Sequence, residues 1–242
     1  MSTTNTPAGD TALLTRDRAD ANSFADARFR MVNDQVRPVE VSDPRIIAAM
    51  RVIPREDCLS GSVRQFAYAD RSLPLGNGRI LMQSMIAARL LQAARIVAGE
   101  NILVAAAGPG YLAALADWLG AKVTALESSP ELLKTGQAFT THAAPGVTWK
   151  EGPLAEGNTE RGPYSLILFD GAISEIPAFC SAQLAEGGRI AGILRRDNGT
   201  ASVFLAERNG STENGTGWGI RRQFDVDVPC IPEFAPKAGF SF

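Results

Sequence analysis

The stretch that decides the fold runs from Glu100 to Glu127 and is ENILVAAAGPGYLAALADWLGAKVTALE. Its segment 102–105 is apolar without alternation, as expected of a strand that is buried on both faces. Gly108 and Gly110 follow, and they allow a sharp turn and a close approach of the backbone to a ligand. The first half of the stretch therefore predicts a strand that enters a glycine-rich turn.

The second half predicts a helix and another buried strand. Apolar residues recur at helical spacing over 111–119, and Gly120 is placed to end that helix. The apolar run 122–126 predicts the strand, and Glu127 lies at its end. A carboxylate there, 17 residues past Gly110, is suited to accept hydrogen bonds from a ribose diol. A strand–turn–helix unit without a ligand fits the stretch equally well, because glycine-rich turns are weak signals.

Helices and strands are expected on both sides of this stretch. Upstream, Asp43 and Pro44 predict the start of a helix, 55–80 is expected to be irregular, and 82–95 predicts an amphipathic helix. Downstream, the pattern predicts, in order, helix 130–140, strands 147–150 and 164–169, helix 176–184, strand 189–194 and a hairpin of strands 201–208 and 218–225. The sum is an α/β protein with a mostly parallel sheet and a ligand crevice at the carboxyl ends of its strands.

Composition favours one large domain. The chain has 242 residues, and 45% of them are hydrophobic, which is ample for a core. A net charge of −2 argues against a dedicated nucleic-acid binder, and no apolar run is long enough to predict a membrane span. Three widely spaced cysteines favour reduced thiols over disulfides or a metal site. We expect a cytoplasmic protein with a disordered leader over 1–20 and a single domain over 21–242.

Three ordered motifs carry a family resemblance. They are DPRIIAAMRVIPRE at 43–56, AYADRSLPLG at 67–76 and GPYSLILFDGAISEIPAFCSAQLAEGGRI at 162–190. Together with the glycine turn, they resemble the protein-L-isoaspartate O-methyltransferase family, within the class I methyltransferases that depend on S-adenosyl-L-methionine. The resemblance implies a three-layer, Rossmann-like, seven-stranded and mostly parallel sheet, with N-terminal helices and a C-terminal antiparallel hairpin.

The resemblance also implies where the cofactor would bind. The loop 106–111 would face its methionine part, Glu127 its ribose hydroxyls and 152–154 its adenine. Asp170 lies at the end of strand 164–169, near where methyl donor and acceptor should meet, so it is a possible catalytic residue; capping of the next helix is the alternative. The implied cofactor-binding residues are Ala106, Ala107, Gly108, Gly110, Tyr111, Glu127, Gly152, Pro153, Leu154 and Asp170.

The cofactor loop departs from the family pattern. Family loops usually begin with an acidic residue two positions before a glycine, whereas Val104 and Ala106 stand here. The lost partner for the ligand's ammonium would cost about 1.5–3 kcal/mol. Alanine restricts the turn wherever a positive φ is required. Pro153 stands where many members have an aspartate that contacts the adenine.

The substrate loop departs further. Typical members carry Gly-Gln-Thr-Ile-Ser, which holds the isoaspartyl group, and this chain has Gly78, Arg79, Ile80, Leu81 and Met82 instead. Because apolar side chains replace both hydroxyl residues, no catalytic serine is transferred. Arg79 is a candidate substitute, since a guanidinium binds a carboxylate through two hydrogen bonds. An ordinary surface charge is the alternative.

Two functions remain open. A carboxylate is ionised at pH 7, so its methylation requires alignment and exclusion of water rather than a strong base. We expect an S-adenosyl-L-methionine-dependent carboxyl O-methyltransferase that acts on isoaspartyl residues of damaged proteins, as in protein repair, or on a related carboxylate. Its partner would be a protein or peptide, with no metal, nucleic acid or membrane. The alternative is a non-catalytic binding or interaction protein that keeps the methyltransferase fold, because the loops are degenerate.

Overall fold

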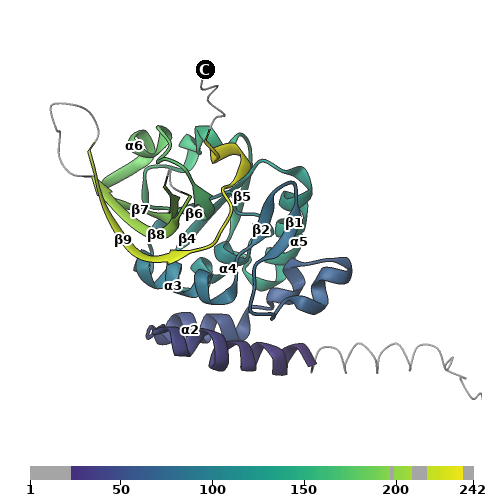
Figure 1. Ribbon diagram of the computed structural model, residues 1–242. Helices are drawn as coiled ribbons and strands as arrows, with labels where there is room; N and C mark the ends of the chain where they lie inside the picture. The colour runs from purple at the N-terminus through teal and green to yellow at the C-terminus, as the bar shows by residue number, and fades with distance from the viewer. Residues whose placement is uncertain (1–22, 197–198, 209–216, 237–242) are drawn as a thin grey trace, which may run out of the picture.

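A seven-stranded sheet with the order β5-β4-β3-β6-β7-β8-β9 forms the centre of the molecule (Figure 1). The computed structural model describes residues 23–196, 199–208 and 217–236, so the expected leader over 1–20 lies outside the described residues. The strands of the sheet are β3 (Asn101–Ala105), β4 (Lys122–Glu127), β5 (Thr148–Glu151), β6 (Tyr164–Ile173), β7 (Leu184–Arg195), β8 (Ala201–Arg208) and β9 (Trp218–Val226).

The directions of the strands determine where their carboxyl ends lie. The neighbours from β5 to β7 pair in parallel, whereas β8 is antiparallel to both β7 and β9. One strand therefore runs against the other six, and the terminal hairpin lies at the edge, as predicted. At the carboxyl end of β3, Ala105 pairs with Leu126 on one side and with Phe169 on the other. The ends of β3, β4 and β6 thus meet at one edge of the sheet.

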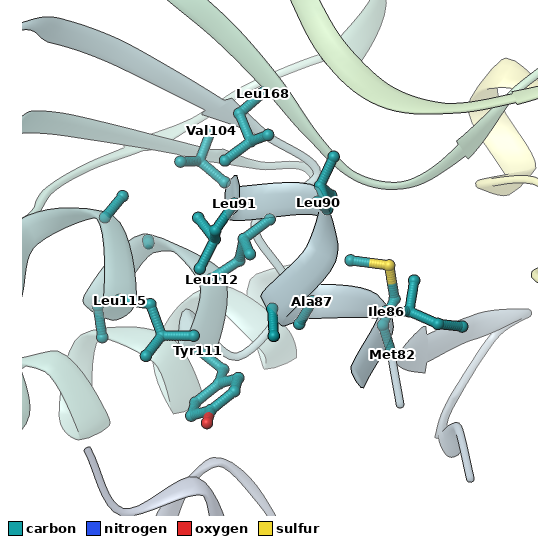
Figure 2. Packing of buried hydrophobic residues seen from close by; sticks show 14 of the residues in the cluster. Met82, Ile86, Ala87, Leu90, Leu91, Val104, Tyr111, Leu112, Leu115 and Leu168 are labelled. Carbon is teal, nitrogen blue, oxygen red and sulfur yellow. The ribbon is translucent and has the colours of Figure 1, made fainter. Parts of the chain in front are cut away.

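Helices and a two-sided core complete three layers. The helices are a segment over 23–31, α2 (Pro44–Val52), α3 (Ser84–Ala94), α4 (Tyr111–Trp118), α5 (Pro130–Ala143) and α6 (Phe179–Gln183). Figure 2 shows side chains of α3 and α4 packed beneath Val104 and Leu168. Their strand neighbours Leu103 and Ile167 belong to the core on the opposite face, with α6. No described helix combines the length and the apolar character that crossing a bilayer demands.

Two expected caps are confirmed, because both depend on local chemistry. The Asp43 carboxylate accepts a hydrogen bond from the Arg45 amide, and Pro44 follows as the first helical residue. Ser129 caps α5 in the same way, with Leu132 as the donor. Each cap satisfies a backbone donor that would otherwise lack a partner in the first turn.

Three expected elements differ from the structure. The segment expected to be irregular contains a hairpin of its own, β1 (Leu73–Gly76) and β2 (Arg79–Leu81), which pairs separately from the main sheet. The helix expected over 176–184 is only α6. Strand β6 continues past residue 169 to Ile173, because Ala172 and Ile173 pair with β7. The C-terminal segment adds a further bond, since the Ile231 amide donates to the Ala172 carbonyl at 2.7 Å.

Candidate functional site

The glycine-rich turn connects β3 to α4 through left-handed backbone. Ala106, Gly108 and Gly110 have φ of 58°, 56° and 85°. The departure at position 106 therefore has a structural consequence, because left-handed geometry costs a residue with a Cβ about 1–2 kcal/mol. Gly110 is also required by packing, since a Cβ there would lie 2.9 Å from the ring of Trp149.

Glu127 lies at the carboxyl end of β4 and is completely buried. Three backbone amides donate to its carboxylate: Gly108 at 2.7 Å, and Ser128 and Ser129 at 2.9 Å each. The carboxylate therefore joins the glycine turn to the start of α5. The position matches the predicted one, at the edge where the parallel strands end.

Arg79 forms the main side-chain contact of Glu127. Its Nη1 and Nη2 donate to Oε1 and Oε2 of Glu127, each at 3.0 Å, and Nη2 also donates to the Ala106 carbonyl at 2.6 Å. The guanidinium comes from strand β2 of the small hairpin and is 7% exposed. Neither sequence interpretation of Arg79 anticipated this arrangement, because the side chain lies in an internal bidentate ion pair.

Asp170 is the second acid at this edge. It lies within β6, one residue past Phe169, and is 6% exposed. Burial raises its pKa to about 7, although the positive charges of Arg79 and Arg55 oppose the shift. The helix-capping alternative is wrong, because the next helix begins only at Phe179. The molecule therefore holds a carboxyl group that changes charge near neutral pH beside the glycine turn.

A buried arginine completes the surroundings of Asp170 and was not predicted. Arg55 is fully buried, donates to the carbonyls of Ala67 and Met82, and lies over the ring of Tyr111 with 5.0 Å to its centroid. Arg55, Tyr111 and Asp170 line one small internal void. Among the described residues, neither Nη1 of Arg55 nor the Tyr111 hydroxyl has a hydrogen-bond partner. The sequence signal that could have pointed to Arg55 is the motif IPRE, which contains it.

The remaining predicted residues separate into two groups. Gly152 is next to the site, since its amide donates to the Glu127 carbonyl at 3.2 Å, and the short helix after Pro153 begins at Leu154. Other side chains are packed into the hydrophobic cores instead, namely those of Met82, Ala107, Tyr111 and Leu154. Figure 2 shows the Tyr111 ring among the core residues of α3 and α4. Tyr111 therefore contributes its backbone to the turn and its ring to the core.

Gly78 and Ile80 of the predicted substrate loop flank Arg79 in the sequence and are less buried than it is. Ile80 is half-buried, and Gly78 is exposed but close to the C-terminal segment, since a Cβ on Gly78 would lie 3.0 Å from Pro232. No cluster of three or more His, Cys, Asp or Glu side chains suited to a metal ion occurs in the described part of the chain. The assembled group is thus a buried carboxylate, a glycine turn, a guanidinium and a second acid.

Comparisons with known proteins agree on one family. The family model for Protein-L-isoaspartate(D-aspartate) O-methyltransferase (PCMT) matches residues 29–216. A protein-L-isoaspartate O-methyltransferase of Methanoculleus marisnigri is 34% identical over 210 residues, which cover 86% of this chain and 92% of that protein. Another, from Rhodopseudomonas palustris, is 36% identical over 172 residues, which cover 71% of this chain and 70% of that protein.

Two solved structures share the fold. A protein-L-isoaspartate O-methyltransferase superposes with a TM-score of 0.71 at 21% identity, covering 84% of this chain and 65% of that one. A Plasmodium falciparum protein in complex with S-adenosyl-L-homocysteine gives a TM-score of 0.68 at 16% identity, covering 87% and 98%. These similarities confirm the predicted Rossmann-like architecture.

Proposed function

Because this chain belongs to the protein-L-isoaspartate(D-aspartate) O-methyltransferase family, we propose that it methylates a carboxylate with S-adenosyl-L-methionine as the methyl donor. The acceptor is the free carboxylate of an isoaspartyl residue in a protein or peptide. The products are the methyl ester of that residue and S-adenosyl-L-homocysteine, and formation of the ester is the step that this chain contributes to repair of a damaged protein. The single observation that carries the proposal is the position of Glu127 at the end of β4, directly across from the glycine turn. The relatives are named as methyltransferases, which favours this function over the non-catalytic alternative.

The donor set of this edge fits the cofactor. The carboxylate of Glu127 is the acceptor that a ribose diol needs, and the backbone of 106–110 permits close approach. Asp170 adds a second acid one residue beyond the pairing of β6 with β3. When bound, the cofactor supplies an electrophilic methyl group on a sulfonium centre.

This chain's own residues would then bind and orient the cofactor and the acceptor, and exclude water from both. The acceptor carboxylate is ionised at pH 7, so no side chain has to remove a proton from it. Proximity and desolvation supply the rate enhancement, and both follow from the buried position of the turn. The described thiols of Cys58, Cys180 and Cys230 are free, which supports a cytoplasmic location.

Calorimetric titration with S-adenosyl-L-homocysteine tests the cofactor site. We expect binding by the wild-type chain, loss of at least tenfold in affinity in Glu127→Ala, and no change in Glu131→Ala. Glu131 is a matched control because it is an exposed acid in the first turn of α5. Absence of binding up to millimolar ligand in the wild-type chain would contradict the proposal.

Methyl transfer tests the acceptor. A peptide with one isoaspartyl residue should accept a labelled methyl group, and the same peptide with a normal aspartyl residue should not. Cofactor binding without transfer to the isoaspartyl peptide would overturn the proposed acceptor and leave the cofactor assignment in place.

A further inference from the structure

We propose that Arg79 occupies the position of the cofactor's ribose, so that this guanidinium must leave Glu127 before the cofactor binds. The inference rests on the proposed function and concerns the regulation of that same site. Arg79 would act as an internal competitor that sets the apparent affinity for the cofactor. The Arg79 side chain would be the moving part, because Leu73 and Leu81 hold the hairpin itself in the hydrophobic core.

The hydrogen-bonding capacity of Glu127 is already used. Its Oε1 accepts from Arg79 and from the amides of Ser128 and Ser129, and its Oε2 accepts from Arg79 and from the amide of Gly108. A carboxylate has about four lone-pair sites for such bonds. Two hydroxyls of a ribose can therefore bind only if donors leave. The backbone donors are fixed by β4, α5 and the turn, whereas Arg79 is a side chain with rotatable bonds.

The same hairpin covers the glycine turn. Residues 106–110 are all buried, although a bound cofactor would have to lie against them. A Cβ built on Gly108 would lie 3.8 Å from Cδ1 of Leu75 and 3.9 Å from Nη2 of Arg79. The residues that face this glycine therefore come from β1 and β2. A cofactor in contact with the turn needs both side chains to move.

The Arg79 side chain can leave Glu127 without disrupting the main sheet. Within the described part of the chain, β1 and β2 pair only with each other and form a separate two-stranded sheet. The connection between them contains Asn77 and Gly78, which are exposed and have positive φ. Displacement of Arg79 thus breaks its ion pair and its bond to Ala106, and leaves the seven-stranded ladder intact.

The charge of the Arg79–Glu127 pair adds a further argument. Arg79 is the leading positive charge that opposes the raised pKa of Asp170, and it is paired with Glu127. The guanidinium therefore neutralises the Glu127 carboxylate in the place where a cationic ligand would bind. S-adenosyl-L-methionine carries a sulfonium charge that S-adenosyl-L-homocysteine lacks. Without Arg79, the site should discriminate in favour of the sulfonium compound.

Affinities of both ligands for Arg79 variants test the inference. We expect Arg79→Gln to bind S-adenosyl-L-homocysteine at least tenfold more tightly than the wild-type chain, and S-adenosyl-L-methionine to gain more than that. Arg79→Lys should be intermediate, because an ammonium cannot make the bidentate pair. Arg71→Gln is the matched control, an exposed arginine just before β1 that contacts the ring of Phe66, and it should stay within twofold of wild type.

The outcomes separate this inference from the proposed function. Unchanged or weaker binding by Arg79→Gln, with wild-type binding that Glu127→Ala abolishes, would overturn the internal competitor and leave the cofactor site standing. Absence of binding by wild type and by both Arg79 variants would overturn the cofactor site together with its competitor. If Arg79→Gln does not fold, Arg79→Lys decides: affinity equal to wild type contradicts the inference, and a severalfold gain supports it.

Discussion

Ala106 shows at the scale of one residue how this site differs from its family pattern. It has a Cβ and a φ of 58°, and its carbonyl accepts a hydrogen bond from Arg79. Left-handed geometry is unfavourable for alanine, so the turn is held in place by its surroundings. The Arg79 contact is one of these restraints. The strain and the ion pair therefore belong to the same local arrangement.

Glycine substitutions at 106 and 107 measure that strain. Ala106 and Ala107 are both completely buried, and only Ala106 has a positive φ. Each change to glycine loses a buried methyl group and adds chain entropy to the unfolded state. We expect Ala106→Gly to be less destabilising than Ala107→Gly by about 1–2 kcal/mol, because only the former relieves left-handed strain.

Urea unfolding of both variants gives this difference directly. Equal midpoints and slopes for Ala106→Gly and Ala107→Gly would contradict the strained turn.

The raised pKa of Asp170 predicts that the stability of the protein depends on pH. Its folded pKa is about 7, above its usual value of 3.8, so the folded state holds a proton that the unfolded state has lost between these values. The free energy of unfolding should therefore fall as pH rises from about 4 to 7, by up to about 1.4 kcal/mol per pH unit. Above pH 7 Asp170 is charged in both the folded and the unfolded state. The free energy of unfolding therefore stays at its lowered value and no longer changes with pH through this group.

The variant Asp170→Asn removes this titration. Its stability relative to wild type should be higher at pH 8 than at pH 5, as measured by denaturant unfolding at both pH values. A stability difference between the two proteins that does not change with pH would refute the assignment.

The sequence predicted some residues of the site because their signals are local. Glu127 follows its strand directly, and Gly108 and Gly110 mark the turn. The partner of Glu127 could not be predicted, because Arg79 is 48 positions away and its hairpin has strands of only four and three residues. The burial of Arg55 could not be predicted from the sequence either, since it depends on packing against Tyr111.

At the scale of elements, the packing of α5 on β5 determines which small residues the fold requires. A Cβ on Gly136 of α5 would lie 2.2 Å from the ring of Trp149 on β5. The Trp149 indole N–H also donates to the Thr140 hydroxyl at 2.8 Å, which fixes the ring. Helix α5 therefore needs a glycine in its interior for a tertiary reason.

Gly136→Ala should accordingly destabilise the protein, which is the opposite of the usual effect of replacing glycine by alanine inside a helix. Glycine to alanine normally stabilises a helix interior by about 0.5–1 kcal/mol. Here we expect destabilisation of about 1–3 kcal/mol, because overpacking displaces the ring. Gln137→Ala, at an exposed neighbour on α5, is the control and should change stability by less than about 0.5 kcal/mol. Thermal unfolding that shows a gain in stability for Gly136→Ala would refute this packing.

Elements were predictable where caps and periodicity act within one segment. Asp43 and Ser129 fix the starts of α2 and α5 through their own side chains. The extension of β6 to Ile173 was missed, because it depends on pairing with β7 and on a bond from Ile231, both of which are tertiary contacts. The strands of β1 and β2 were missed since neither is long enough to show alternation.

At the scale of the whole molecule, two segments that are far apart in the sequence meet over the carboxyl edge of the sheet. The β1–β2 hairpin brings Arg79 to Glu127, and the short helix Pro232–Phe234 brings Glu233 to the Ser128 hydroxyl at 2.6 Å. The two hydrophobic cores hold the sheet between them and leave this edge to polar contacts. The fold therefore provides a sheet edge with a glycine turn and two peripheral segments that lie over it.

A crystal structure of the wild-type chain with S-adenosyl-L-homocysteine tests the central claim most directly. The ribose hydroxyls should lie within hydrogen-bond distance of the Glu127 carboxylate, and the Arg79 guanidinium should have left that carboxylate. The seven-stranded sheet should be unchanged. A ligand bound elsewhere, or a ligand at the turn with the ion pair of Arg79 and Glu127 intact, would contradict the account.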